Sequence, residues 1–254
     1  MPDERTRIRD YAAQYQSDYG FEYHMVRARQ QLILHLLAEL RPRSVLEIGC
    51  GDDQLIEAAR EADFAKWVIV EPSEAFASKA REVAVDEKRL SVVPGFFPDC
   101  AAELAAYTRE GGYDLLICSS LLHEVADPVG MMDAARDLVN IGGWVHVNVP
   151  NAQSLHRRLA RAMGLIGREE ELSERNLKFG HHRVLDRAGL ADLVQSVGLN
   201  PVQEGGYMLK PFTHQQMDLI PFLSNQLTEG LNILGSELPD LASEIYVNCQ
   251  RSDH

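Results

Sequence analysis

Two glycines and a distant acid are the residues whose types and spacing point most directly to chemistry. Residues 45–53 read VLEIGCGDD, so an apolar run leads into Gly49-Cys50-Gly51 and then into a helix-like segment. Glycines permit a tight turn and let a ligand approach the backbone without a Cβ in the way. A helix that begins after such a turn presents free N–H groups to a polar ligand. The pattern predicts a loop that binds a nucleotide-like molecule.

An acid at the end of the next apolar run narrows the class of ligand. Glu71 follows the run VIV, about 20 residues after the glycine turn, where a carboxylate can accept hydrogen bonds from ribose hydroxyls. A dinucleotide site needs a third glycine where this chain has Gln54, and Asp52 and Asp53 would repel a pyrophosphate. The residues therefore predict a ligand with a ribose, a positive group and no phosphates, which disfavours an NAD-dependent oxidoreductase.

Residues 45–53 resemble the glycine-rich motif of class I S-adenosylmethionine-dependent methyltransferases, and residues 113–128 are similar to the fourth motif of that family. The resemblance is closest over residues 44–150 and extends more loosely to residue 198. It implies S-adenosylmethionine (SAM) as the cofactor. The cofactor-binding residues it implies are Glu47, Gly49, Cys50, Gly51, Glu71, Pro72, Phe96 and Ser119. The usual adenine-binding Asp is missing beside Phe96, which leaves that contact to the backbone and the ring.

The implied activity is transfer of the SAM methyl group to an oxygen or nitrogen of a small-molecule metabolite, with O-methylation favoured. His123 and His182 are the candidate catalytic residues, because a neutral imidazole can take a proton from a hydroxyl as the methyl group moves. A cap or packing role for His123 is an equally good interpretation. The adjacent His181 and His182 also fit metal ligation, but no carboxylate pair lies near them in the sequence, so no metal is predicted. A cofactor-binding partner or regulatory protein without turnover stays an alternative.

Candidate acceptor-binding residues come from three segments: Tyr11, Tyr15 and Tyr19, then Asn151, then Arg183. The tyrosines recur every fourth residue, so they form either a lid over the acceptor or a packing face. A basic cluster around Arg183 fits an anionic acceptor group, although internal pairing with nearby acids explains it better; its other members are Arg157, Arg158, Arg161 and Lys178, and the acids are Glu169, Glu170, Glu171 and Glu174. Residues 207–212, with Phe222 and Leu223, fit either a roof over the pocket or a dimer surface.

Alternating strand-like and helix-like segments predict the scaffold that positions these residues. The predicted strands are 44–49, 67–72, 90–95, 113–119, 144–150, 202–209 and 244–250. The predicted helices between them are 53–62, 73–84, 98–110, 128–139 and 186–197, with Asp53 and Ser73 as N-caps and Gly142-Gly143 before the fifth strand. An amphipathic helix precedes the first strand, and residues 211–241 form a mostly helical interruption.

We therefore expect an α/β fold: a Rossmann-like, doubly wound sheet of seven strands, mainly parallel with an antiparallel last strand, and helices on both faces. A helical lid precedes the sheet and a cap insertion interrupts its end. The expected organisation is a single methyltransferase domain over 1–254, with an N-terminal extension (1–41), a cofactor-binding core (42–150) and substrate-side insertions with closing strands (151–254).

Composition limits the partners and the compartment. A net charge of -13 repels phosphate backbones, which disfavours nucleic acid as a partner. No apolar run is long enough to span a membrane, and the charged N-terminus lacks the apolar core of a signal peptide. The four cysteines are scattered, as in a reduced cytoplasmic protein. We expect a cytoplasmic monomer or homodimer that acts on a small molecule.

Overall fold

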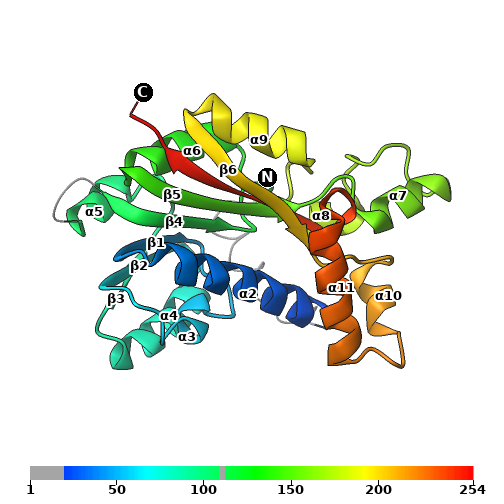
Figure 1. The fold of residues 1–254 in the computed structure, drawn as a ribbon, viewed down its shortest axis with the longest axis horizontal. Coiled ribbons are helices and arrows are strands. Elements are labelled where there is room, and N and C mark those ends of the chain that lie inside the picture. The colour runs from blue at the N-terminus through cyan, green and yellow to red at the C-terminus, as the bar shows by residue number, and fades with distance from the viewer. Residues whose placement is uncertain (1–19, 109–111, 254) are drawn as a thin grey trace.

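A seven-stranded sheet is the centre of the computed structural model, which describes residues 20–108 and 112–253. The strand order is β3-β2-β1-β4-β5-β7-β6 (Figure 1). The strands are β1 (Ser44–Ile48), β2 (Lys66–Glu71), β3 (Leu90–Pro94), β4 (Tyr113–Ser119), β5 (Val139–Pro150), β6 (Leu199–Tyr207) and β7 (Glu244–Arg251). β1 to β5 pair in parallel, whereas β7 runs antiparallel to both of its neighbours, β5 and β6. The predicted mainly parallel sheet with an antiparallel last strand is confirmed.

Helices cover both faces of the sheet because its strands alternate between two apolar cores. Leu46, Val68 and Leu116 face a core that also holds residues of α5, α6 and α9. Their neighbours Val45 and Trp67 face the opposite core, which is closed by α2, α3 and α4. The helices are α2 (Glu22–Leu40), α3 (Leu55–Ala58), α4 (Glu74–Asp86), α5 (Ala101–Ala106), α6 (Pro128–Asp137), α7 (Leu155–Ala162), α8 (Glu174–Lys178), α9 (Arg187–Ser196), α10 (His214–Asp218) and α11 (Asn225–Glu237).

Two local predictions are wrong and one is confirmed. Ser73 caps α4 as predicted, with its side chain accepting from the Phe76 N–H. The predicted cap Asp53 precedes a much shorter helix, α3, whose N-cap is Gln54 and makes no side-chain cap bond. Gly142-Gly143 lies within β5 rather than before it, because that strand already begins at Val139.

The interruption between β6 and β7 packs against the first turns of α2. It holds α10, α11 and a 3-10 turn (Pro239–Leu241), which lie together at one end of the molecule (Figure 1). Phe21 and Met25 share a buried cluster with Met208 and Met217. The predicted cap insertion is therefore present and closes one end of the sheet over α2.

The N-terminal extension is described only from its helix onward. α2 covers one face of the sheet, with Ile33, Leu36 and Leu37 buried. Tyr11, Tyr15 and Tyr19 lie outside the described residues, so the lid interpretation stays a prediction. None of the helices that the structure describes combines the length and apolar character that a membrane crossing requires.

Candidate active site

A cavity of about 750 Å³ opens where β1, β2, β4 and β5 end. Parallel sheets place their ligands outside the carboxyl ends of the strands, since the connecting loops diverge there. The turn after β1, the acid that ends β2 and the segment after β4 all line this cavity, and α2 forms another wall. The predicted cofactor residues therefore share one cavity with residues of α2 and of the segment after β4, which lie outside the glycine-rich motif.

The turn after β1 adopts a backbone conformation that requires glycine. Gly49 and Gly51 have φ angles of 76° and 64°, where a Cβ would be strained. A Cβ added at Gly51 would meet no atom within 4 Å, so the space beside it belongs to the open cavity. The turn therefore leaves room for a ligand to lie directly against the backbone.

The Glu71 carboxylate is held at the edge of this space. One oxygen accepts from the Cys50 N–H at 3.0 Å and the other from the Ser73 N–H at 2.8 Å. Burial raises the pKa of Glu71, and these backbone N–H groups oppose that shift. A carboxylate at this position can accept hydrogen bonds from ribose hydroxyls. The site fits the adenosine part of SAM on these grounds.

Glu47 lies beneath the glycine turn and contacts the cavity. Its carboxyl accepts from Trp67 Nε1 at 2.9 Å and is 4% exposed. Burial raises the pKa of Glu47 to about 8, opposed by the Trp67 bond and assisted by the charge of Glu71. A positively charged ligand group would favour the ionised form, which suits a cofactor that carries an amine and a sulfonium.

The remaining predicted cofactor residues also lie at the cavity. Pro72, Phe96 and Ser119 line it, and the Ser119 hydroxyl donates to Asn148 Oδ1 at 2.6 Å. Asp52, beside the glycine turn, forms an ion pair with Lys79. The structure therefore brings all eight predicted cofactor residues together, while their roles remain predictions.

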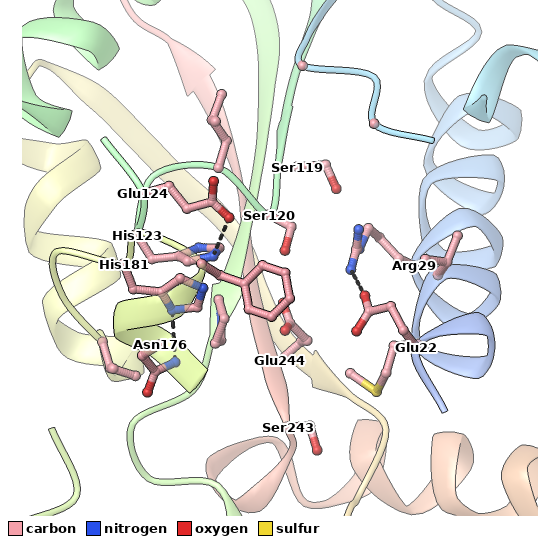
Figure 2. A pocket seen from close by; sticks show the side chains of 18 of the residues that line it. Glu22, Arg29, Ser119, Ser120, His123, Glu124, Asn176, His181, Ser243 and Glu244 are labelled. Carbon is pink, nitrogen blue, oxygen red and sulfur yellow. Dashed lines mark hydrogen bonds and ion pairs between the residues drawn. The ribbon is translucent and has the colours of Figure 1, made fainter. Parts of the chain in front are cut away.

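His123 follows β4 and is buried at the cavity wall. Its Nε2 lies 3.5 Å from a Glu124 carboxylate oxygen, and within the described part of the chain its buried Nδ1 has no hydrogen-bond partner. Burial lowers the pKa of His123 to about 3. Figure 2 shows His123 and Glu124 on one wall of the pocket, across from Glu22 and Arg29 of α2.

His181, rather than the predicted His182, joins His123 in the cavity. The two rings are T-shaped with centroids 4.2 Å apart, and Asn176 holds His181 Nδ1 at 2.9 Å (Figure 2). His182 is exposed and its side chain lies outside the cavity; only its backbone N–H reaches this wall, donating to the His123 carbonyl at 2.8 Å. Alternation along an extended segment places adjacent side chains on opposite sides, which the sequence pair alone did not resolve.

The histidine pair has an acid beside it after all. Donor atoms of His123, Glu124 and His181 lie within 4.8 Å of one another, an arrangement that can hold a metal ion. Glu124 lies far from His181 in the chain, so the sequence alone did not indicate a carboxylate beside the histidine pair. A metal-free reaction stays a prediction.

Arg183 and Asn151 are bonded to the protein itself. The Arg183 guanidinium donates to the Leu122 and Ala126 carbonyls, each at 3.0 Å, and to the Val125 carbonyl. Arg183 is not among the cavity-lining residues, and its donors fix the loop that carries His123. Its contact with the acceptor stays a prediction. Asn151 does line the cavity, but its amide donates to the Asp240 and Ala242 carbonyls.

Two members of the basic cluster are bonded within the protein, one of them to an acid that the sequence offered. Arg161 contacts both carboxylate oxygens of Glu169, at 2.7 and 2.8 Å. Arg157 donates to the Glu169 and Glu171 carbonyls. These contacts occupy the guanidinium groups of Arg157 and Arg161.

A network of polar side chains lines and supports the part of the cavity that lies away from the glycine turn. The sequence alone did not predict this network. Arg29 contacts the Tyr207 hydroxyl at 3.3 Å and Glu22 at 3.4 Å. Asn148 connects Ser119 to Tyr207 and Glu244. These residues come from α2, β4, β5, β6 and β7, and only the assembled sheet brings them together.

Comparisons with known proteins agree with this geometry. Residues 21–204 match the family model of the methyltransferase domain. The ubiquinone biosynthesis O-methyltransferase of Ralstonia nicotianae is 29% identical over 181 residues, which cover 69% of this chain and 71% of that protein.

Solved structures share the fold at low sequence identity. A SAM-dependent methyltransferase of Thermotoga maritima has a TM-score of 0.59 at 15% identity, covering 96% of this chain and all (100%) of that one. The N-methyltransferase NodS of Bradyrhizobium japonicum, solved with S-adenosylhomocysteine, has a TM-score of 0.51 at 11% identity, covering 89% and 86%. The chain therefore belongs to the methyltransferase domain family and is a SAM-dependent methyltransferase.

Proposed function

We propose that the enzyme methylates an oxygen of a small phenol. The observation that carries this proposal is the juxtaposition of His123, Glu124 and His181 in the same cavity as the glycine turn. The matched relatives of Ralstonia nicotianae and Bordetella avium, both 29% identical, are named O-methyltransferases of ubiquinone biosynthesis, which favours oxygen over nitrogen as the acceptor atom.

The protein's contribution is alignment and proton removal. When bound, SAM supplies a methyl group on a positively charged sulfur, which is already activated for displacement. Glu71 and the glycine turn would hold the adenosine, and Glu47 would favour the cationic end. Met25, Val26 and Phe179 add apolar surface to the cavity, against which an aromatic ring can pack while water is excluded.

His123 is the proposed general base. Its pKa of about 3 keeps it neutral at pH 7, so it can accept a proton. The same low pKa makes it a weak base, although the Glu124 carboxylate lies 3.5 Å from Nε2, where a negative charge favours the imidazolium. A phenol, with a pKa near 10 as in tyrosine, loses its proton far more readily than an alcohol. A phenolic acceptor therefore matches a weak base.

All three parts of the chain contribute to this site, which supports one methyltransferase unit. Residues of α2, of the core and of the segment after β5 line the same cavity. The single-domain organisation and the assignment of the three segments to lid, core and acceptor side are proposals on that basis.

Incubation with SAM and matched acceptors tests the function. Catechol and aniline are offered separately, and products are identified by mass spectrometry after isotope-labelled methyl transfer. We expect O-methylated catechol and no methylated aniline. Methylated aniline alone would replace oxygen by nitrogen as the acceptor atom, and S-adenosylhomocysteine binding without turnover on any phenol would favour a non-catalytic, cofactor-binding protein.

A further inference from the structure

Lys210 is a buried cation that lines the cavity and has no role in the proposed methyl transfer. It follows β6, lines the cavity and is 3% exposed. Its ammonium lies 3.2 Å from His214 Nδ1, and among residues 20–108 and 112–253 no carboxylate forms an ion pair with it. Burying a charge without an opposite charge in contact is costly, so this position calls for an anion.

The two nearest acids are bound to other groups. Glu22 lies 3.4 Å from Arg29 and 3.2 Å from His214 Nε2; burial opposes its ionisation, but these partners lower the pKa of Glu22 to about 2. Glu244 accepts from Asn148 at 3.3 Å and Tyr207 at 3.4 Å, and burial raises its pKa to about 7. Glu244 is thus only partly ionised near neutral pH and compensates the ammonium weakly.

The surroundings of Lys210 are otherwise basic. Arg157 and Arg175 line the same cavity and disfavour its charge. His156 also lines the cavity, and its buried Nδ1 finds no hydrogen-bond partner among the residues that the structure describes. Burial lowers the pKa of Lys210 to about 8, with Glu22 and Glu244 opposing, so the ammonium form predominates at pH 7. A charged donor and an unsatisfied ring nitrogen therefore face one space.

We propose that Lys210, together with His156, binds a carboxylate on the methyl acceptor, so that the substrate is a phenolic carboxylic acid. His214, whose two ring nitrogens face Lys210 and Glu22, would hold the ammonium in place. This inference rests on the proposed O-methylation and names its substrate class. It also moves the expected anion site away from Arg183, whose donors are used by loop carbonyls.

Calorimetric titration of the S-adenosylhomocysteine complex tests the site without requiring turnover. Benzoate and benzamide have nearly the same shape and differ in charge. We expect benzoate to bind at least about tenfold more tightly, which corresponds to about 1.4 kcal/mol for one charged contact. Equal affinity for the two ligands in the unmodified enzyme would overturn the proposal.

Two variants assign the preference to Lys210. In Lys210→Met the tenfold discrimination should collapse to less than twofold, whereas in Lys88→Met, which removes an exposed lysine, it should persist. Circular dichroism establishes that each variant is folded. A folded Lys210→Met protein that still prefers benzoate would contradict the assignment.

Turnover then separates this inference from the proposed function. With 3,4-dihydroxybenzoate and its amide as acceptors, we expect KM to be about tenfold lower for the acid. Methylation of both acceptors at equal KM would contradict the carboxylate site but support the proposed O-methylation. Benzoate binding that depends on Lys210, without methylation of either acceptor, would support the carboxylate site and contradict the proposed O-methylation.

Discussion

The two halves of the cavity are built in different ways. The cofactor half is assembled from the ends of adjacent strands, with Gly49, Gly51 and Glu71 held by short local bonds. The acceptor half is assembled from α2, the loop after β4, the segment around His181 and the stretch after β6. The first half is built mainly from one βαβ unit and is completed by Phe96 and Ser119, whereas the second exists only when distant segments pack.

Electrostatics differ between the halves as well. The cofactor half offers Glu47 and Glu71, two buried carboxyls that suit a cationic ligand. The acceptor half offers His123, the proposed proton acceptor, and Lys210, a buried cation 3.2 Å from His214 Nδ1. A cationic methyl donor and an anionic acceptor would thus each find complementary charge, which places the two substrates in a fixed order within one chamber.

Removing the proposed base should have the largest effect on the acceptor half. We expect His123→Ala to lower kcat at least about 100-fold, because general-base catalysis contributes roughly that much. The affinity for S-adenosylhomocysteine should stay within about twofold. Steady-state kinetics and calorimetry measure both, and His182→Ala, whose side chain is exposed, provides the matched comparison. Equal activity in the two variants would eliminate His123 as the base.

Removing the ribose-binding acid should affect the cofactor half selectively. We expect Glu71→Gln to weaken S-adenosylhomocysteine binding at least about tenfold, since a hydrogen bond to a charged group contributes about 1.5 kcal/mol or more. Glu74→Gln, at an exposed position three residues later, should bind normally. If Glu71→Gln bound S-adenosylhomocysteine as tightly as the unmodified enzyme, Glu71 would not be a cofactor-binding residue.

Arg183 tests whether the acceptor half depends on positioning. Arg183→Ala removes the donors that hold the carbonyls around His123, so we expect kcat to fall about tenfold and the melting temperature to drop. Arg183→Lys should restore part of the activity. If KM for the acceptor rose while kcat stayed constant, Arg183 would bind substrate directly, as the sequence first predicted.

Acid should destabilise the acceptor half through its histidines. Burial lowers the pKa values of His123 and His181 to about 3. Between pH 6.5 and 3 the unfolded chain therefore binds protons that the folded chain does not, and the free energy of unfolding falls as pH falls. Each histidine contributes up to about 1.4 kcal/mol per pH unit. Urea unfolding at pH 6 and 5 should show a smaller decrease in His123→Asn than in the unmodified protein; an identical decrease would refute the linkage.

Chelation should have the smallest effect. Dialysis against EDTA is expected to leave kcat/KM within about twofold, because the histidines can take the proton without a metal. The comparison uses the same enzyme after addition of Mg²⁺ or Zn²⁺. Loss of activity restored by either ion would identify His123, Glu124 and His181 as ligands and contradict the prediction of a metal-free site.

The sequence predicted the cofactor half well because its signals are local. The strand, the glycine turn and the acid follow one another along the chain. Each of them requires a particular type of residue, which can be recognised in the sequence. The β1 to β4 bounds deviate from prediction by one residue at most. Helix lengths were less predictable: α3 spans only Leu55–Ala58, since the segment before it stays extended at Gln54.

The acceptor half left weaker signals in the sequence. His181 and His182 are equivalent in composition, and only the backbone direction decides which one enters the cavity. Arg183 looked like a ligand for an anion, yet its partners are carbonyls, which have no sequence signature. Lys210 could not be distinguished from a surface lysine until the packing of β6 against α10 and α2 buried it.

A crystal structure with S-adenosylhomocysteine tests the central claim most directly: that the turn at Gly49–Gly51 and the Glu71 carboxylate hold the cofactor beside His123. We predict density for the ribose within hydrogen-bonding distance of Glu71, with the sulfur directed toward the His123 wall. Density for the ligand outside this cavity, or a ribose that does not reach Glu71, would contradict the account.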